Sequence, residues 1–313
     1  MSIRPILRGV ISYIPILKKA LPQKGTGGSS SSQYCYSVWM RHLRHLESCG
    51  LEKIPYAVGE LEPGDSLGIG LAAILSGANK YYALDVIKHA ETENNIRILH
   101  ELHQLFIQNE HIPDGSDFEF VNPKVDSVLL PSLLTYTGSD KNLSASRLIE
   151  INNATIEYKI NSNISISYLV PWDDSKIIKY NTLDLIFSQA VMEHVSDIES
   201  AYAKMYDWLK PGGLISHQID FKAHETHDKW YGHHSYSKIL WRIIMHGRKY
   251  DINRLPLSHH TKTILKSGFE ILKVVPVFSE RMPDCIVNRK YSDKFSEEDK
   301  NISSALIIAR KVF

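Results

Sequence analysis

The stretch Tyr56–Val86, YAVGELEPGDSLGIGLAAILSGANKYYALDV, decides the fold that we expect for this chain. Its pattern predicts a strand that ends at Glu60-Leu61, a tight turn over 62–65, and a helix rich in small residues over Ser66–Ser76. A second strand follows over Lys80–Leu84. Strand, helix and strand in this order form a βαβ unit, from which parallel sheets are built.

Two positions in this unit predict a nucleoside-type ligand. Gly64 lets the backbone of the turn approach a ligand and take a positive φ without strain, and the helix start behind it presents unpaired N–H groups. Asp85, at the tip of the second strand, is placed to accept hydrogen bonds from a ribose. The spacing Gly64-x-x-x-Gly68-x-Gly70 is not the GxGxxG of a dinucleotide fingerprint, and no GxxxxGK[ST] run of a P-loop is present. Gly68 and Gly70 fall inside the predicted helix as close-packing positions.

The composition is that of a soluble globular protein, with 313 residues, 43% apolar and 23% charged, and a net charge of +1. This balance offers no broad basic field, which argues against nucleic acid as a partner. The three cysteines, Cys35, Cys49 and Cys285, show no CxxC spacing and favour a reducing compartment, so we expect a cytoplasmic protein. No apolar run approaches the roughly 18 residues that cross a bilayer.

The N-terminal residues 1–22 leave two interpretations open. Apolar side chains alternate there with arginine and lysine, which fits an interfacial anchor peripheral to the inner face of a membrane. The alternative, which we favour, is an arm that packs on its own domain or on a dimer partner. Arg8 and two prolines interrupt the segment and no small-residue cleavage site follows, so we do not expect a signal peptide.

Residues 1–50 are predicted to form an N-terminal arm and a capping helix. Residues 24–33, KGTGGSSSSQ, are typical of a flexible polar link. The following residues, Tyr34–Glu47, have apolar side chains at helical spacing. This helix stands directly before the first strand, where it either lies across the mouth of the ligand site or packs on the sheet.

Residues 51–313 are predicted to form one domain. Besides the opening unit, we expect helices over Glu91–Asn109, Ser196–Leu209 and His259–Ser267, and strands over Ile164–Val170, Leu183–Ser188, Leu214–Asp220, Phe269–Val277 and Ser303–Val312. Ser196 is the expected N-cap of its helix, with Glu199 completing a capping box. The regions 111–155 and 221–258 are insertions. The fold class is therefore α/β, with a doubly wound, mostly parallel sheet, an antiparallel edge strand and helical insertions.

Three blocks resemble class I S-adenosylmethionine-dependent methyltransferases. GELEPGDSLGIG at 59–70 resembles the glycine-rich first motif, LDLIFSQAVMEHV at 183–195 the fourth-strand block, and LKPGGLISHQID at 209–220 the fifth-strand block. The resemblance implies a Rossmann-like methyltransferase fold with a seven-stranded sheet, and S-adenosylmethionine as cofactor. The run HQIDFKAH at 217–224 is similar to a bacterial subgroup that is associated with surface-polysaccharide biosynthesis.

The resemblance also implies which residues hold the cofactor. Glu60 would organise the methionine amino group, Gly64 would allow close backbone approach, and Asp85 would accept from both ribose hydroxyls. The remaining implied contacts are Asp173 (or Asp174 in its place) to the adenine amino group, and Ser188 and Gln189 on the opposite wall. Glu62 departs from the family, which usually has glycine there, and its side chain could crowd the methionine end.

The acceptor is expected over the fourth and fifth strands, because open α/β sheets bind ligands beyond the carboxyl ends of their strands. Methyl transfer is an in-line displacement, and a hydroxyl acceptor must also lose its proton, which histidine can take near neutral pH. The candidate catalytic residues are His194, His217, Asp220 and His224. A metal site built from Asp220, His224 and His227 is the alternative; since the spacing matches no dedicated zinc motif, we predict no metal.

The predicted function is methyl transfer from S-adenosylmethionine to a small or sugar-containing acceptor, at a hydroxyl group. Aromatic residues between 230 and 241 add weak support for a glycan acceptor. Two alternatives stay open. One is an N- or carboxyl-methyltransferase, which needs little or no base. The other is a non-catalytic cofactor-binding or scaffold protein with a degenerate glycine motif, for which Glu62 is the reason.

Overall fold

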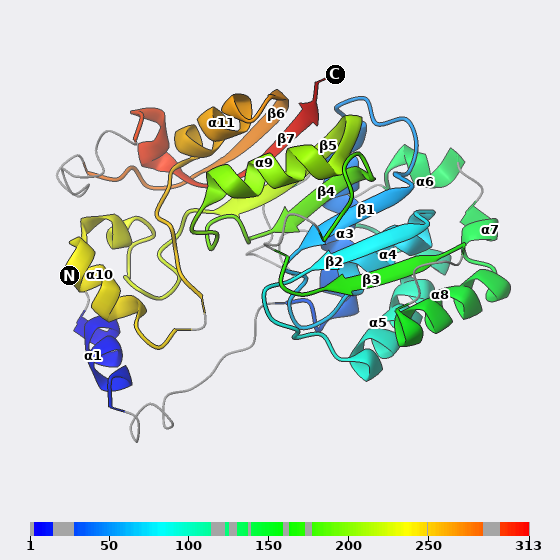
Figure 1. The fold of residues 1–313 in the computed structure, drawn as a ribbon, viewed down its shortest axis with the longest axis horizontal. Helices are drawn as coiled ribbons and strands as arrows, with labels where there is room; N and C mark the ends of the chain where they lie inside the picture. Colours follow the sequence, from blue (N-terminus) through cyan, green and yellow to red (C-terminus); the bar gives the residue numbers. More distant parts are fainter. Residues whose placement is uncertain are drawn as a thin grey trace.

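A single twisted sheet forms the centre of the molecule (Figure 1). The computed structural model describes residues 3–14, 28–113, 123–124, 130–136, 139–158, 163–172, 177–248, 250–283 and 295–312. Within these residues the sheet has seven strands in the order β3-β2-β1-β4-β5-β7-β6. Strand β7 runs antiparallel to both of its neighbours, whereas the other pairs are parallel. The predicted doubly wound, mostly parallel fold with an antiparallel edge is therefore confirmed.

The predicted strands are present with small shifts of their ends. Their bounds are β1 Ala57–Leu61, β2 Lys80–Leu84, β3 Ser165–Leu169, β4 Leu183–Gln189, β5 Leu209–Asp220, β6 Phe269–Phe278 and β7 Ile302–Lys311. Only β5 begins well before its predicted start at Leu214. The reason is a bulge: Leu183 pairs with Leu209 and Leu185 pairs with Leu214, so the residues between them bulge out without ending the strand.

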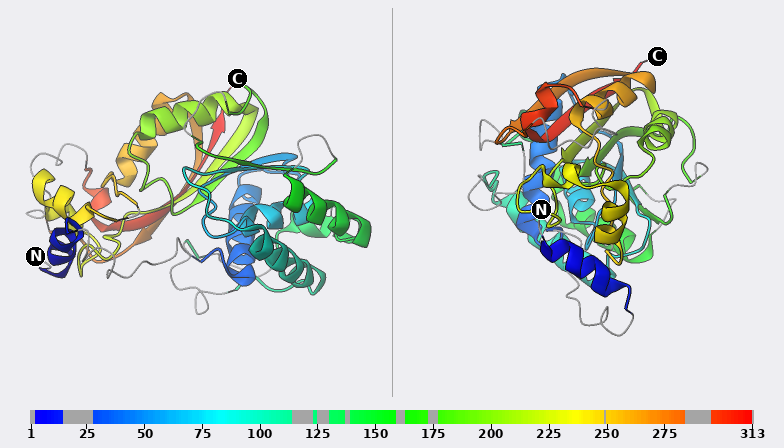
Figure 2. Two further views of the ribbon diagram at one scale, coloured as in Figure 1. Left: turned by 60° about the horizontal axis from the view of Figure 1, so that its bottom comes forward. Right: turned by 90° about the vertical axis from the view of Figure 1, so that its left-hand side faces the viewer.

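Helices cover both faces of the sheet (Figure 2). Helices α3 (Ser32–Glu47), α4 (Gly68–Ser76) and α5 (Thr92–Ile107) cover one face, and α9 (Ile198–Trp208) and α11 (Leu257–Lys266) cover the other. Alternate residues of a strand point to opposite faces, and in β1 Val58 joins the first core while Ala57 joins the second. This double cover explains why the central strands are almost entirely apolar.

The insertion 111–155 contributes three further helices within its described part. These are α6 (Ser132–Tyr136), α7 (Ser139–Asn142) and α8 (Ala145–Glu157), and α8 packs against α5. The short helices expected here are thus present. Residues 114–122 and 125–129 lie outside the described part of the chain.

Helix α3 packs on the sheet as a largely buried helix. The indole Nε1 of Trp39 donates a hydrogen bond to Ser76 Oγ at 2.7 Å, and the ring of His42 contacts Ser216 Oγ of β5 at 2.8 Å. Of the two interpretations of this helix, packing on the sheet is the one that the contacts support. Its first turn nevertheless reaches the carboxyl end of β1, where the candidate site lies.

The start of α9 differs from the prediction that Ser196 caps it. The helix begins at Ile198 and its N-cap is Asp197, whose carboxylate accepts from the backbone N–H of Ser200 at 2.9 Å. A charged carboxylate is favoured at this end of the helix dipole. The capping box of Ser196 and Glu199 is therefore wrong by one residue.

The N-terminal helix α1 (Ile3–Ser12) packs on α10 (Lys238–Met245), to one side of the sheet (Figures 1 and 2). Ser12 Oγ donates to the carbonyl of His246 at 2.8 Å, and the ring of Tyr13 stacks on His246 at 3.5 Å. Residues 3–14 therefore behave as an arm that packs on the insertion 221–258 of the same chain. None of the described helices is long and apolar enough to span a bilayer.

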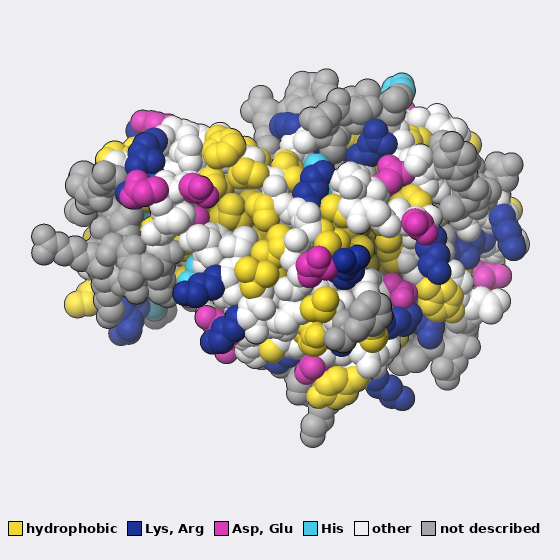
Figure 3. All heavy atoms as spheres, turned by 90° about the horizontal axis from the view of Figure 1, so that it is seen from above, with side chains coloured by type: hydrophobic (Ala, Val, Ile, Leu, Met, Phe, Trp, Pro, Cys, Tyr) yellow, Lys and Arg dark blue, Asp and Glu magenta, His cyan; other side chains and the backbone are white. Residues whose placement is uncertain are grey.

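The surface shows no basic field on the side that Figure 3 displays. Lysine and arginine side chains are interspersed there with acidic and apolar ones. This mixed pattern agrees with the net charge of +1.

We predict that Gly70→Ala destabilises the protein. A Cβ at Gly70 in α4 would overlap the ring of Tyr81 in β2, and overpacking of this kind costs about 1–3 kcal/mol. Urea unfolding followed by circular dichroism measures the effect. The matched control is Gly212→Ala, where no atom lies near the added Cβ and only the positive φ of 77° opposes alanine. Equal stability of Gly70→Ala and the parent protein would contradict the close-packing interpretation.

Candidate functional site

A small pocket opens at the carboxyl ends of β1 and β4, where the order of the strands reverses. Its lining consists of Gly28, Ser29, Tyr34, Glu60, Glu62, Pro63, Gly64, Ile69 and Gln189. Three of the predicted cofactor contacts, Glu60, Gly64 and Gln189, are therefore together in one pocket. Open α/β sheets bind ligands at this kind of position.

The turn after β1 is held by backbone and side-chain contacts. The N–H of Glu62 donates to the carbonyl of Leu84 at 2.7 Å, which ties the turn to the end of β2. Gly64 has a φ of 79°, a conformation that glycine adopts without strain. The turn thus takes the shape that its sequence predicts.

Side chains from the polar link and from α5 also contact the residues after this turn. Ser29 Oγ, in the polar link, accepts from the N–H of Ser66 at 3.3 Å. Asn95 Oδ1, in α5, accepts from the N–H of Leu67 at 2.9 Å. These bonds satisfy N–H groups just before α4, which begins at Gly68 rather than at the predicted Ser66. The sequence interpretation missed Ser29 as part of the site, because a run of serines and glycines carries no periodicity.

Glu60 is a buried carboxyl group in the pocket wall, with 2% of its surface exposed. Tyr81 donates its hydroxyl hydrogen to Glu60 Oε2 at 2.5 Å. Burial raises the pKa of Glu60 to about 8, although the hydrogen bond from Tyr81 acts in the opposite direction. A ligand that brings a positive charge to this carboxylate would favour its ionised form.

Asp85, which follows the end of β2, is fully buried. Its Oδ2 accepts from the hydroxyl of Tyr168 at 2.9 Å, and its Oδ1 accepts from the N–H of Ile87 at 3.2 Å. Asp85 is therefore not part of the pocket lining, although it stands at the predicted end of β2.

Glu62, the residue that departs from the family pattern, interacts with Asp85. Its Oε1 accepts from the indole N–H of Trp172 at 2.5 Å. Burial, together with a hydrogen bond to Asp85 and the negative charge of Asp85, raises the pKa of Glu62 to about 8. Glu62 also has a φ of 50°, in the left-handed region that favours glycine. The side chain thus turns toward the ribose end of the predicted site.

Two predicted residues, Ser188 and His217, lie in the core between the sheet and α9. They are cross-strand partners in β4 and β5, and Ser188 Oγ contacts His217 Nδ1 at 2.7 Å. Both are fully buried, and burial lowers the pKa of His217 to about 3. Neither lines the pocket. Asp173 and Asp174 lie outside the described residues.

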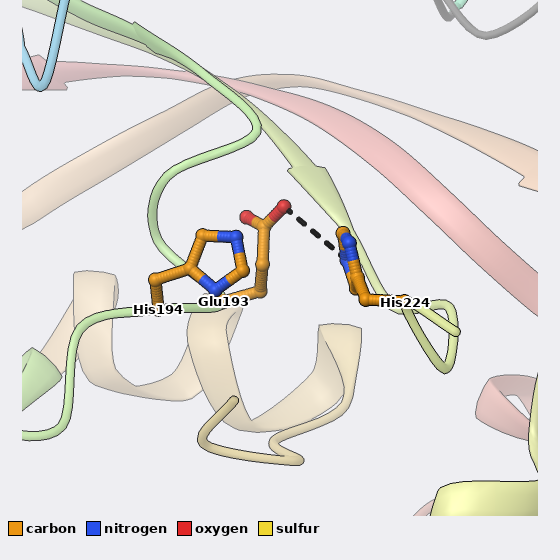
Figure 4. A group of neighbouring side chains, drawn as sticks. All are labelled: Glu193, His194 and His224. Atoms are coloured by element: carbon orange, nitrogen blue, oxygen red, sulfur yellow. Dashed lines mark ion pairs between the residues drawn. The ribbon is translucent and has the colours of Figure 1, made fainter. Parts of the chain in front are cut away.

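The other three candidate catalytic residues, His194, Asp220 and His224, gather with Glu193 at the ends of β4 and β5. Figure 4 shows Glu193, His194 and His224 of this group. His224 Nε2 lies 3.8 Å from Glu193 Oε1 and 3.9 Å from Asp220 Oδ2. The rings of His194 and His224 meet edge to face at 5.2 Å. We call Glu193, His194, Asp220 and His224 the acidic–imidazole cluster. Sequence interpretation missed Glu193, although it directly precedes His194 in the EHV block.

The ionisation of this cluster is shaped by burial. Burial, and next the charge of Asp220, raises the pKa of Glu193 well above its ordinary value. Burial lowers the pKa of His194 to about 4, so its imidazole is neutral at physiological pH. His227 is not in the cluster; its Nδ1 accepts from the N–H of Lys229 at 3.0 Å.

The aromatic residues of the insertion 221–258 mostly belong to its own small core. Tyr231, Tyr236 and Trp241 are buried, and Trp230 donates its indole N–H to the carbonyl of Glu280 at 2.8 Å. They therefore add no support for a sugar-binding surface.

A family model described as a methyltransferase domain matches residues 150–216. The match covers β3, β4 and the start of β5, and it confirms the methyltransferase resemblance of that part of the sequence. No curated protein matches the chain in sequence.

Solved structures with a similar fold are methyltransferases of low sequence identity. Phosphoethanolamine N-methyltransferase 2 of Haemonchus contortus is 16% identical, with a TM-score of 0.43, over 88% of this chain and 53% of that one. A putative sarcosine dimethylglycine methyltransferase of Galdieria sulphuraria is 14% identical (TM-score 0.44, 88% and 85%). Geranyl diphosphate C-methyltransferase of Streptomyces coelicolor is 10% identical (TM-score 0.46, 87% and 78%). This chain thus spans about half the length of the Haemonchus protein.

We predict that Glu60 makes the stability of the protein fall between about pH 4.5 and pH 8. Its pKa is raised from 4.5 to about 8, so in this window the folded chain keeps a proton that the unfolded chain releases. Removing the group with Glu60→Gln should therefore stabilise the variant relative to the parent as pH rises, by up to about 1.4 kcal/mol per pH unit.

Urea unfolding at several pH values tests this prediction. Glu52→Gln, which changes an exposed glutamate, is the control and should leave the difference flat. Parallel pH profiles of the parent and Glu60→Gln would show that Glu60 ionises alike in both states.

Proposed function

We propose that this protein transfers a methyl group from S-adenosylmethionine to a hydroxyl group of a small or sugar-containing acceptor. The observation that carries the proposal is the pocket with Glu60, Gly64 and Gln189, which lies beside the acidic–imidazole cluster on the same edge of the sheet. The strand order and the family-model match over residues 150–216 support the same class of enzyme.

The pocket fits the methionine part of the cofactor. Glu60 is a buried carboxyl group, and a ligand ammonium would stabilise its ionised form. Gly64 leaves room for close backbone approach, and Gln189 stands on the opposite wall. When bound, the cofactor supplies a methyl group on a sulfonium, which is strongly electrophilic.

The ribose end fits only after a local change. Asp85 is at the position that would accept from ribose hydroxyls, but it is fully buried in this structure and interacts with Glu62. Rotation of the Glu62 side chain away from Asp85 and Trp172 would expose the carboxylate. The raised pKa of Glu62 favours its neutral form. A neutral side chain needs no charged partner, whether it points toward Asp85 or has rotated away from it.

The acidic–imidazole cluster would serve the acceptor. Most of the rate of an in-line displacement comes from holding the nucleophile aligned with the methyl group. A hydroxyl nucleophile must also lose a proton, and imidazole and carboxylate groups at the ends of β4 and β5 can accept it. The presence of this cluster favours a hydroxyl over an amine or a carboxylate, which would need little or no base.

The sugar-containing nature of the acceptor rests on sequence resemblance alone. Residues 217–224 are similar to the subgroup associated with surface-polysaccharide biosynthesis. We propose a cytoplasmic location as well, which the three cysteines without CxxC spacing favour.

A non-catalytic cofactor-binding or scaffold protein is the second candidate, and the contact between Glu62 and Asp85 is the observation that favours it. Both candidates bind S-adenosylmethionine, whereas a protein that has lost the cofactor does not. Measuring this binding, and whether it depends on Glu62, therefore distinguishes the two candidates from such a protein.

We predict that Glu62→Gly tightens the binding of S-adenosylmethionine by about three- to tenfold. Glycine frees Asp85 and relieves the left-handed φ at this position, and tenfold corresponds to about 1.4 kcal/mol. Titration calorimetry with the folded parent and variant measures the affinities. Glu62→Gln, which keeps the size of the side chain, is the control and should bind like the parent. No binding by folded parent protein would refute the proposed function, and weaker binding by Glu62→Gly would make Glu62 a ligand contact.

We predict that Asp220→Asn and His224→Ala each lower kcat by about 100-fold or more while leaving the affinity for S-adenosylmethionine unchanged. A group that assists proton removal typically contributes 10²–10⁴-fold. His217→Phe is the comparison: His217 is buried against Ser188, so its loss should lower stability and affect kcat far less. Assays with an identified acceptor test this, and unchanged kcat in both cluster variants would exclude base catalysis by the cluster.

We also propose that α1 contacts the inner face of a membrane. One face of α1 packs on α10. The other face exposes the apolar side chains of Ile3, Leu7 and Val10 and the cationic side chain of Arg4. An amphipathic helix of this kind can lie at an anionic lipid surface. Packing of α1 on its own domain and contact with lipid use different faces of the helix.

We predict that the full-length protein floats with vesicles that contain phosphatidylglycerol, and that the double variant Leu7→Asp/Val10→Asp does not. The side chains of Leu7 and Val10 are 54% and 49% exposed, so replacing them should leave the fold intact. Ile149→Asp, at an exposed residue of α8, is the control. Absence of the full-length protein from the vesicle fraction would refute membrane contact.

A further inference from the structure

Glu193 is a buried acid without a well-formed hydrogen bond in the described part of the chain; weak contacts with the backbone of Glu193 and Asp220 favour its ionised form. Its exposed fraction is 2%, and within the described residues neither carboxylate oxygen has a hydrogen-bonding partner of good geometry. His224 Nε2, at 3.8 Å from Glu193 Oε1, is also buried without such a partner. Buried polar groups are nearly always paired, because leaving them unpaired costs free energy. A cation between these atoms would satisfy both.

We propose that Glu193, His194 and His224 bind a divalent transition-metal cation of the Zn²⁺ type. Each residue offers one ligand atom, and these atoms all lie within 4.8 Å of one another. Figure 4 shows the three side chains converging on a common space between the segment after β4 and the loop after β5. Small side-chain rotations would bring the atoms to the 2.0–2.2 Å typical of zinc bonds.

The hydrogen bond of His194 prepares it for this role. Its Nδ1 lies 2.6 Å from the carbonyl oxygen of Asp251, which can only accept, so Nδ1 carries the proton. The lone pair is then on Nε2. Metal-binding histidines usually donate their second ring nitrogen in this way, which fixes the ring and its tautomer.

The backbone around the cluster is also held in rare conformations. Ala190, just after β4, has a φ of 54°, and His224 has a φ of 42°. Such strained residues are kept only where the surrounding structure enforces them, and they gather at functional sites. Ala190 comes shortly before the proposed ligand Glu193, and His224 is itself a proposed ligand. Both residues lie at the ends of central strands.

The donor set selects the class of metal. Two imidazoles and one carboxylate suit Zn²⁺, Fe²⁺ or Mn²⁺, whereas Mg²⁺ and Ca²⁺ prefer oxygen ligands alone. Three protein ligands also leave a position open, as catalytic zinc sites do. Asp220 lies close to the proposed ligands, with its Oδ2 3.9 Å from His224 Nε2.

The role of the cation rests on the proposed function. At the acceptor end of the site it would polarise the acceptor hydroxyl and lower its pKa. The O–H proton would pass to Asp220, the oxygen would bond to the methyl carbon, and the C–S bond of the sulfonium would break to leave a neutral thioether. The prediction from sequence spacing that the protein holds no metal is replaced by this proposal, with Glu193 and His194 in place of Asp220 and His227.

Metal binding is tested on the full-length protein after treatment with a chelator. Titration with Co²⁺, followed by visible absorption, should show one ion bound per chain, and Zn²⁺ should displace it. Glu193→Gln and His224→Ala should each weaken Co²⁺ binding at least 100-fold. His100→Ala, at an exposed histidine of α5, is the matched control and should bind Co²⁺ like the parent. Circular dichroism and thermal unfolding verify that each variant is folded.

The proposal is overturned if the parent protein binds no Co²⁺ or Zn²⁺ at micromolar concentrations, or if folded Glu193→Gln binds as tightly as the parent. Calorimetry with S-adenosylmethionine on the metal-free protein keeps this outcome separate from the proposed function. Cofactor binding without metal binding rejects only the metal site. Metal binding without cofactor binding rejects the methyltransferase function and leaves the metal site standing.

Discussion

Burial of carboxyl groups at the carboxyl ends of the parallel strands is the constraint on which the rest of this site depends. Glu60 and Glu193 are each 2% exposed, and Glu62 is half-buried. Burial is the largest cause of the raised pKa in all three. Removing an acid from water is unfavourable unless it is protonated or meets a positive charge. A cationic ligand would stabilise the ionised form of these acids, and the ammonium of the methyl donor and the metal ion that we propose are two such ligands.

The framework of the fold could be predicted from sequence because its strands are apolar on both faces. Runs such as Leu183–Ser188 have few structural alternatives once helices alternate with them. Element ends were less predictable. The bulge between Leu183 and Leu185 extends β5, and one carboxylate, Asp197, displaces Ser196 as the cap of α9. The start of β5 and the cap of α9 depend on local contacts, and the periodic pattern of apolar residues carries no information about such contacts.

The candidate site was predictable in position but not in the direction of each side chain. Ser188 and Gln189 are neighbours in β4, and neighbouring residues of a strand point to opposite faces. Gln189 lines the pocket, and Ser188 therefore points into the core, where its cross-strand partner His217 meets it. Ser29 could not be found from sequence either, since a serine-rich link gives no sign of which residue it will contact.

The two halves of the site are joined through the end of β4. Gln189 lines the donor pocket, and the chain reaches Glu193 and His194 within a short segment whose first residue, Ala190, donates its N–H to the carbonyl of Gln218 in β5 at 3.0 Å. Asp220 lies at the end of the same strand β5. Hydrogen bonds between β4 and β5 thus tie the pocket to the acidic–imidazole cluster. Because in-line transfer depends on alignment, such a link would hold donor and acceptor in register in the reaction that we propose, and Glu62 is the side chain that would have to move.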